Sequence, residues 1–157
     1  MDQSFDMIAS LYNLPQVKIN EKIQIKRAYP SDKDIILDFI KKNFEKNWIY
    51  EAEYAIVSDI SKCFVAVDNK KIIGFACFDS SAKGFFGPMG VLKKRRGEKI
   101  GATLLYKTLL AMKEYGYAYA IIGWVNDAKE FYEKTINAQV IQNSSPSNSV
   151  YSRLIEM

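Results

Sequence analysis

The clearest structural signal in the sequence is a series of three β-rich segments that leads through a basic turn into an amphipathic helix. The segments span residues 63–67, 72–78 and 84–92, and short polar stretches typical of turns separate them. From Ile100 to Gly116, apolar residues recur every three or four positions, which predicts a long helix. We therefore expect three antiparallel strands, a basic turn and a helix at the centre of the fold.

The remaining segments predict further strands and helices on both sides of this centre. Before it, the patterns predict a strand at 22–29, a helix at 31–46 and a short second helix within 47–60. After it follow a strand at 117–125, a helix at 127–135, a strand at 138–142 and a last strand at 150–155. No internal boundary is visible, so residues 22–157 are expected to form one domain.

Residues 1–21 are expected to form an N-terminal extension of this domain. Apolar residues recur in it at helical spacing before a break at Leu14-Pro15: Phe5, Ile8, Ala9 and Tyr12. The preferred interpretation is a short helix that caps the domain.

The chain has no histidine and only two cysteines, which excludes several classes of catalytic and metal site. Ser-His-Asp and Cys-His systems, HExxH zinc sites and an imidazole base all require histidine. Cys63 and Cys77 alone cannot supply four ligands to zinc or an iron–sulfur cluster. The first ten residues do not resemble a signal peptide, and no apolar run approaches the ~20 residues of a membrane span. We therefore expect a cytoplasmic protein with no metal and no membrane contact.

The positive charge of the chain is concentrated in one turn. The sequence has 22 basic and 18 acidic residues, a formal charge of +4, and Lys93–Lys99 contains five basic residues and one acidic residue. The rest of the chain is therefore formally neutral. A nucleic-acid-binding protein more often spreads basic residues over a whole face, so we expect no nucleic-acid partner. A solvated loop or a weak nucleic-acid patch is the alternative interpretation.

The position of this turn, directly before the long helix, favours binding of an anion. A helix N-terminus presents unpaired backbone N–H groups and the positive end of the helix dipole. The four consecutive cations at 93–96 indicate a multiply charged phosphate as the ligand. The P-loop pattern GxxxxGK[ST] and the dinucleotide-binding pattern GxGxxG are both absent.

The stretch Val91–Ala102 resembles the acetyl-CoA signature Q/R-x-x-G-x-G/A of the GCN5-related N-acetyltransferase (GNAT) superfamily. In this register Arg96 is the basic anchor, Gly101 is the last small residue and Lys99 replaces the first glycine. The resemblance implies that the backbone N–H groups of seven residues hold the CoA pyrophosphate: Arg96, Gly97, Glu98, Lys99, Ile100, Gly101 and Ala102. It also implies that Lys93 to Arg95 lie near the phosphates, and that the backbone at Met89 and Val91 holds the pantetheine arm and the acyl carbonyl.

The lysine at position 99 is the main departure from the signature. A glycine there would let the backbone approach the pyrophosphate without a Cβ atom in the way. Lys99 therefore either weakens cofactor binding or adds a phosphate contact, and we favour retained binding.

A second stretch, Asn126–Lys134, resembles the next motif of the family, N-x-x-A-x-x-x-Y-E-K. The resemblance implies that Tyr132 lies near the CoA sulfur and protonates the leaving thiolate, and that Asn126 positions cofactor or backbone at the end of a strand. From the residue alone, Tyr132 would be interpreted as a core tyrosine on a short helix.

By this resemblance the fold is a single-domain α/β (α+β) structure, with a mixed, mostly antiparallel sheet of six to seven strands and helices on both faces. The implied function is that of an N-acetyltransferase in which an amine attacks acetyl-CoA directly, without a metal. The alternative is a non-catalytic acyl-CoA-binding or sensing module. The protein is expected to be a monomer or a homodimer.

The general base and the acceptor pocket are left open by the sequence. Glu51, Glu53 and Asp79 are candidate bases, although each residue alone would be interpreted as an ordinary surface acid. Four aromatic residues are candidates for an acceptor pocket, with core packing as the alternative: Trp48, Tyr50, Tyr54 and Trp124.

Overall fold

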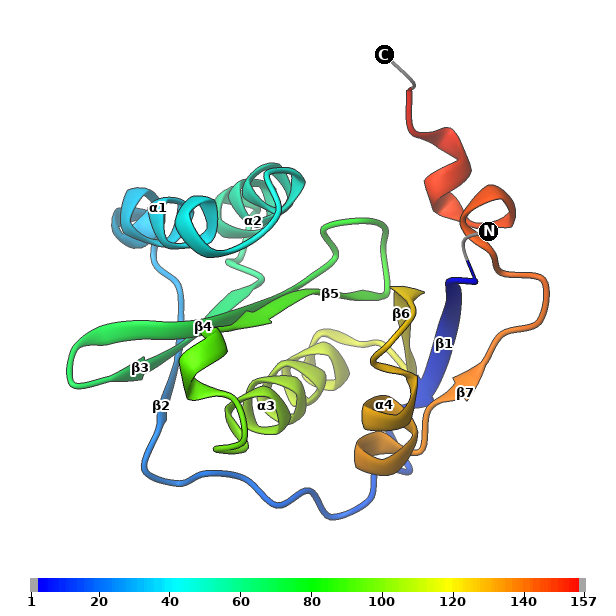
Figure 1. Cartoon of the computed structure of the whole chain (residues 1–157), viewed down its shortest axis with the longest axis horizontal. Coiled ribbons are helices and arrows are strands. Elements are labelled where there is room, and N and C mark those ends of the chain that lie inside the picture. The colour runs from blue at the N-terminus through cyan, green and yellow to red at the C-terminus, as the bar shows by residue number, and fades with distance from the viewer. Residues whose placement is uncertain (1–2, 156–157) are drawn as a thin grey trace.

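In the computed structural model, which describes residues 3–155, seven strands form one sheet (Figure 1). The strands are β1 (Phe5–Ser10), β2 (Gln24–Arg27), β3 (Cys63–Asp68), β4 (Lys71–Phe78), β5 (Phe85–Val91), β6 (Tyr119–Val125) and β7 (Gln139–Val140). Their order is β2-β3-β4-β5-β6-β1-β7, and every neighbouring pair is antiparallel except β5 and β6, which are parallel. The expected mixed, mostly antiparallel sheet is therefore confirmed.

Helices cover both faces of this sheet (Figure 1). The four α-helices are α1 (Lys33–Asn43), α2 (Asn47–Val57), α3 (Ile100–Tyr115) and α4 (Lys129–Ile136). Four short 3₁₀ turns are η1 (Pro30–Asp32), η2 (Lys93–Arg95), η3 (Pro146–Asn148) and η4 (Val150–Arg153). The helices α1 and α2 lie on one face, and α3 and α4 lie on the other.

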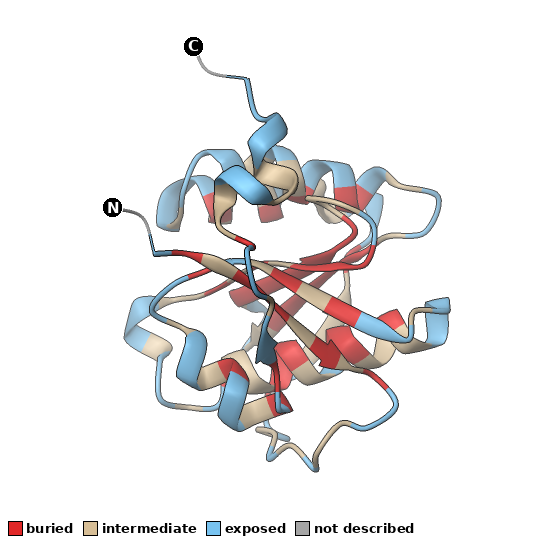
Figure 2. Ribbon diagram, turned by 90° about the vertical axis from the view of Figure 1, so that its right-hand side faces the viewer, coloured by how far each residue is buried: buried red, intermediate tan, exposed pale blue. Residues whose placement is uncertain are grey.

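The apolar spacing in the helices produces two cores, one on each face of the sheet. On α3, buried residues repeat at intervals of three and four: Ile100, Leu104, Leu105, Leu109 and Met112. On the opposite face, Ile36 and Ile40 of α1 pack with α2 against Phe75 of β4. Buried residues are concentrated where helix and sheet face each other (Figure 2). Burial of this apolar surface supplies the main driving force for the three-layer arrangement of helices, sheet and helices.

Cys63 and Cys77 are register partners on β3 and β4, and both are buried free thiols. Burial raises the pKa of the Cys77 thiol well above its ordinary value, so the group stays protonated and unreactive.

The N-terminal segment is a strand, and the helix expected within residues 1–21 is wrong. β1 lies between β6 and β7 and pairs antiparallel with both. Met7, Ala9 and Leu11 alternate along the segment and are almost fully buried, as the two-residue period of a strand requires. Residues 1 and 2, and residues 156 and 157 at the other end, lie outside the described residues.

The last strand, expected at 150–155, is also wrong, because η4 occupies this segment. β1 already fills the position between β6 and β7, so the hydrogen-bonding edges of both strands there are taken. The other expected elements are confirmed with small changes in their ends, and the strand at 138–142 shortens to Gln139–Val140. Within residues 3–155, no helix combines the length and apolarity that a bilayer crossing demands.

Candidate active site

The sheet opens between β5 and β6. These parallel strands pair only at their beginnings, where Phe85 faces Ile121 and Phe86 faces Ile122. Beyond this point, residues 89–91 pair with β4 on one edge and have no strand partner on the other. The open edge leaves backbone groups of β5 available to an extended ligand, as the edge of a sheet does.

A bulge in β5 directs its side chains at this opening. Ala76 faces Met89 and Phe78 faces Phe86, so β5 contains one extra residue between these pairs. Gly87 lies in this bulge and has a φ of 117°. Glycine adopts this conformation readily, whereas other residues are strained in it. As a result, Phe86 and Met89 both pack toward the core under α3.

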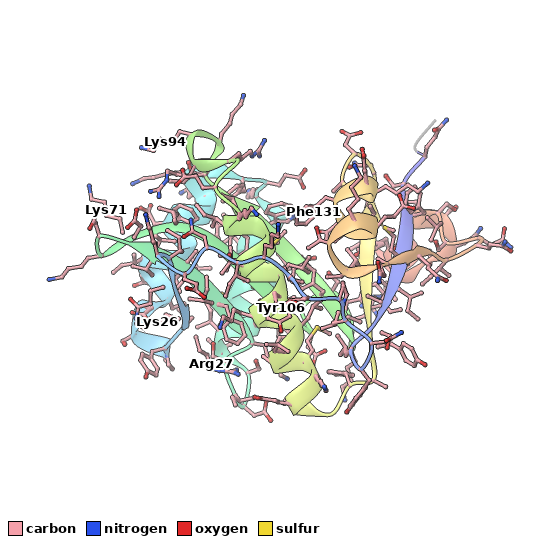
Figure 3. The ribbon with its side chains drawn as sticks, turned by 90° about the horizontal axis from the view of Figure 1, so that it is seen from below. Lys26, Arg27, Lys71, Lys94, Tyr106 and Phe131 are labelled. Carbon is pink, nitrogen blue, oxygen red and sulfur yellow. The ribbon has the colours of Figure 1, made fainter. Side chains whose placement is uncertain are left out.

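The first turn of α3 comes close to the open edge at Gly101. A Cβ atom on Gly101 would lie 3.9 Å from the side chains of Met89, Val91 and Phe131. Figure 3 shows Phe131, from α4, beside α3. The structure thus brings the predicted residues of β5 and of the signature together, and adds Phe131, which the sequence did not single out.

The basic turn leaves its backbone N–H groups free. Gly97 (φ 87°) and Lys99 (φ 62°) adopt left-handed conformations, and α3 begins at Ile100. The N–H groups of Arg95 and Arg96 donate within the turn, and that of Thr103 donates to the carbonyl of Lys99. Between them, no acceptor in the described part of the chain takes the N–H groups of residues 97–102. Such a cluster of unpaired donors at a helix N-terminus is suited to an anion.

The acidic residue of this turn is neutralised locally. Arg95 donates to both carboxylate oxygens of Glu98 at 2.7 and 3.0 Å, and to Asp68 of β3 at 2.9 Å. The hydrogen bonds from Arg95 lower the pKa of Glu98. Because Arg95 is paired with two carboxylates, its guanidinium is not free for a ligand. The other four basic side chains of the turn make no ion pair within residues 3–155: Lys93, Lys94, Arg96 and Lys99. Four free cations therefore remain beside the unpaired N–H groups.

Asn20 holds the turn from outside. Its side-chain amide donates to the carbonyl of Glu98 at 2.9 Å, and its backbone N–H donates to the hydroxyl of Thr103 at 2.9 Å. The Thr103 hydroxyl donates in turn to the carbonyl of Lys99 at 2.6 Å. An asparagine in a loop has no sequence signal for this role, and Asn20 falls within the predicted extension.

Tyr132 lies on α4 at the point where β5 and β6 separate. Its side chain is 9% exposed, and its ring packs edge-on against Phe86 of β5 and Phe131. Burial raises the pKa of Tyr132, so the phenol holds its proton at neutral pH. Its hydroxyl makes no hydrogen bond within the described residues.

Asn126 lies at the exposed end of β6, where its side chain accepts the N–H of Asp127 at 2.6 Å. One residue, not two, separates Asn126 from Ala128, so this part of the chain is one residue shorter than the family motif that it resembles. Within residues 3–155, the side chain of Asn126 makes no hydrogen bond to β5 or to the basic turn.

Two of the three candidate bases lie beside a lysine ammonium. Asp79 is buried, accepts from the N–H of Gly84 and the hydroxyl of Tyr117 at 2.8 Å each, and lies 3.6 Å from the ammonium of Lys62. Glu53 is exposed and lies 3.8 Å from the ammonium of Lys33.

Glu51 is the third candidate. It faces the sheet from α2, where one carboxylate oxygen accepts from the hydroxyl of Ser81 at 3.4 Å. Burial raises its pKa above the ordinary value, which is the direction expected for a carboxylate that takes up a proton.

The four aromatic candidates do not form one pocket. Trp48 packs with Phe44 and Phe75 in the core under α1 and α2. Tyr50 and Tyr54 are each about 60% exposed, whereas Trp124 of β6 packs edge-on against Tyr151. The residues 3–155 also contain no cluster of three acidic or sulfur ligands able to hold a metal ion.

Comparisons with known proteins agree with this geometry. A sequence model of the Acetyltransferase (GNAT) domain matches residues 59–135. No curated protein matches the chain. Among solved structures, the chain is similar to a GCN5-related N-acetyltransferase from Sphaerobacter thermophilus, with a TM-score of 0.69 and 18% identity, covering 88% of this chain and 48% of that chain.

Two further structures are similar. One is the GCN5-related glucosamine N-acetyltransferase region of a fungal multi-domain GH3 β-N-acetylglucosaminidase (TM-score 0.69, 18% identity, covering 88% of this chain and 20% of that chain). The other is a GNAT family acetyltransferase from Brucella melitensis in complex with acetyl-CoA (TM-score 0.53, 17% identity, covering 81% and 93%). The chain thus spans about half of the Sphaerobacter protein and about a fifth of the fungal one. At these identities the similarity establishes the fold.

Proposed function

We propose, on the premise that residues 59–135 belong to the GNAT acetyltransferase family, that this protein transfers an acetyl group from acetyl-CoA to an amine. The main support is the convergence of three features at the open edge of β5. They are the unpaired backbone of residues 89–91, the cationic turn with its free N–H groups, and the buried phenol of Tyr132.

Acetyl-CoA fits this set of groups as a substrate. Its pyrophosphate carries the negative charge that the free N–H groups of residues 97–102 and the four free cations would neutralise. Its pantetheine arm is extended and carries amides, which can pair with the open edge of β5 near Met89 and Val91 as a strand would. Gly101 keeps the space between these groups free of a side chain.

The reaction then needs two proton transfers and no covalent enzyme intermediate. The neutral acceptor nitrogen attacks the thioester carbonyl carbon, the C–N bond forms, and the C–S bond breaks. Tyr132 supplies a proton to the leaving sulfur, since burial keeps its phenol protonated. Glu51 takes the proton of the amine, directly or through water, because burial raises its pKa, whereas Asp79 and Glu53 each face a lysine ammonium.

The test is a free-thiol release assay across a panel of amines, with Tyr132→Phe as the variant. We expect kcat to fall by at least about tenfold, because general acid catalysis is lost, while the Kd for acetyl-CoA measured by calorimetry stays within about twofold. Tyr106→Phe is the matched control, since Tyr106 lies half-buried on α3 (Figure 3) and makes no hydrogen bond through its hydroxyl within residues 3–155. Equal losses of kcat and affinity in Tyr132→Phe would mean that Tyr132 is a packing residue.

A non-catalytic acyl-CoA-binding module is the second candidate, and the observation that favours it is Lys99 in the place of the signature glycine. Calorimetry combined with the thiol assay separates the two functions. Tight binding of acetyl-CoA with no thiol release from any amine would favour the module.

A further inference from the structure

Two tyrosines lie on opposite faces of the sheet at the point where β5 and β6 separate. Phe85 and Phe86 are consecutive on β5, so their side chains point to opposite faces. The ring centroid of Phe86 lies 6.5 Å from that of Tyr132, and the centroid of Phe85 lies 6.4 Å from that of Tyr151. Tyr151 therefore covers the opening from the face of α1 and α2, across the sheet from Tyr132.

The phenol of Tyr151 lies directly on the backbone of β6. A Cβ atom built on Gly123 would come within 2.0 Å of its hydroxyl oxygen. The ring of Trp124 packs edge-on against Tyr151, with the centroids 4.9 Å apart. Only a glycine at position 123 allows the Tyr151 hydroxyl to lie this close to the backbone. The sequence of β6 therefore permits the Tyr151 ring to cover the opening.

Tyr151 belongs to a segment, residues 144–153, that crosses this face and that we call the C-terminal strap. In Figure 1 the strap lies at the C-terminal end, on the same side of the sheet as α1 and α2. Asp6 of β1 anchors one end, since it accepts from the hydroxyl of Ser149 while its own N–H donates to the hydroxyl of Ser144 at 2.9 Å. Arg153 anchors the other end by donating to the carbonyl of Ser81, in the loop between β4 and β5.

Two carboxylates, those of Asp6 and Glu51, and one cation, Arg153, act on Tyr151. Burial is the main cause that raises the pKa of Tyr151 to about 12; the charges of Asp6 and Glu51 also raise it, whereas a hydrogen bond with Ser81 and the charge of Arg153 lower it. The same carboxylates would attract the ammonium form of an amine that reached this place, because opposite charges interact strongly where water is limited. The hydroxyl of Ser81 links Glu51 to this group of residues.

We propose that the C-terminal strap is a gate on the acceptor side of the active site, and that a cationic amine reaches the thioester only after Tyr151 leaves Gly123. The inference rests on the proposed function. If acetyl-CoA occupies the α3 and α4 face, the acceptor must approach from the opposite face, which Tyr151 covers. The gate keeps water from the thioester until an amine competes for the place of the phenol.

The test is the hydrolysis of acetyl-CoA without any amine, followed by release of the CoA thiol. In this side reaction water attacks the thioester carbonyl carbon, the C–S bond breaks, and acetate, a proton and free CoA result. We expect Tyr151→Ala to raise the hydrolysis rate by roughly tenfold, because the opening becomes accessible to water. Tyr151→Phe keeps the ring and is the matched control, with an expected change below about twofold. Arg153→Ala releases one anchor and is expected to give an intermediate rise.

A second variant tests the gate without removal of its tyrosine. Gly123→Ala places a Cβ where the phenol lies and displaces the ring, so hydrolysis is expected to rise as in Tyr151→Ala. Unchanged hydrolysis in both variants, with acetyl-CoA affinity retained, would overturn the gate and leave the proposed function standing. If the unaltered protein does not bind acetyl-CoA, the proposed function is overturned, and the gate is overturned with it.

Discussion

Replacement of Lys99 by glycine should stabilise the fold and preserve acetyl-CoA binding. Lys99 has φ 62° and ψ 20°, where an L-residue brings its Cβ close to the following carbonyl at a cost of roughly 1–2 kcal/mol. Glycine avoids this cost but loses about 0.5–1 kcal/mol more backbone entropy on folding. The side chain is exposed and makes no ion pair within residues 3–155, so no contact is lost with it. The net gain should be about 1 kcal/mol.

The assay is urea unfolding combined with a thermal melt. For a chain of 157 residues, a gain of this size raises Tm by about 2–4 °C. Lys70→Gly is the matched control for backbone strain, because Lys70 is also exposed and has a φ of 64° in the turn between β3 and β4. The two glycine variants should gain similar stability, whereas Lys99→Ala keeps the Cβ and should gain none.

The same variants separate the backbone of position 99 from its ammonium. If the left-handed backbone shape is what the pyrophosphate needs, Lys99→Gly binds acetyl-CoA at least as well as the unaltered protein. A large loss of affinity in both Lys99→Gly and Lys99→Ala would show that the ammonium is a phosphate ligand. A destabilised Lys99→Gly beside a stabilised Lys70→Gly would refute the strain argument itself.

Substitutions at Gly101 and Glu51 test the site further. Gly101→Ala should retain acetyl-CoA affinity, because the added Cβ would meet its three neighbours at an ordinary contact distance of 3.9 Å. It should also stabilise α3 by roughly 0.5–1 kcal/mol, since alanine favours a helix more than glycine does. Gly101→Leu should fill the space and lower the affinity measured by calorimetry at least tenfold. The folded-state pKa of Glu51 is raised above the ordinary value of 4.5, so its contribution to stability is present below pH 4.5 and is lost as the pH rises through the folded-state pKa. Glu51→Gln should therefore unfold at higher urea than the unaltered protein at pH 7 but not at pH 4.5, and should lower turnover, while the exposed Glu53→Gln should show neither effect.

Local patterns were sufficient to predict the centre of the fold. The three strands before the basic turn and the helix after it are specified by neighbouring residues, and their bounds differ from the expected ones by at most one position. The predicted residues of β5 and the signature come together because one strand, one turn and one helix follow each other in the chain. Their roles in catalysis stay predictions until the variants are measured.

Segments whose structure depends on distant partners could not be predicted in the same way. The spacing of Phe5, Ile8 and Tyr12 fits one face of a helix, but Met7 and Leu11 fit the buried face of a strand equally well. The choice is made by β6, which offers a hydrogen-bonding edge more than a hundred residues later.

The structures of the C-terminal segment and of Asn20 also depend on residues that are distant in the sequence. Residues 150–155 contain the strand-favouring residues Val150, Tyr151 and Ile155, yet the edge between β6 and β7 is taken by β1. The side chain of Asn20 holds the basic turn by a hydrogen bond to the carbonyl of Glu98, 78 positions away. No local sequence pattern reveals this contact.

The place of β1 in the sheet has a consequence for synthesis on the ribosome. Phe5 pairs with Val125, and Ile8 pairs with both Ile121 and Gln139, so β1 can find its partners only after residues 119–140 have also emerged. Until then, β1 is an apolar strand with two unpaired edges, and such strands pair readily with other chains. The half of the sheet around β6 should therefore form late, and its folding rate should be limited by this long-range closure. Capture of partly synthesised chains by chaperones should depend on β1 more than on any other strand.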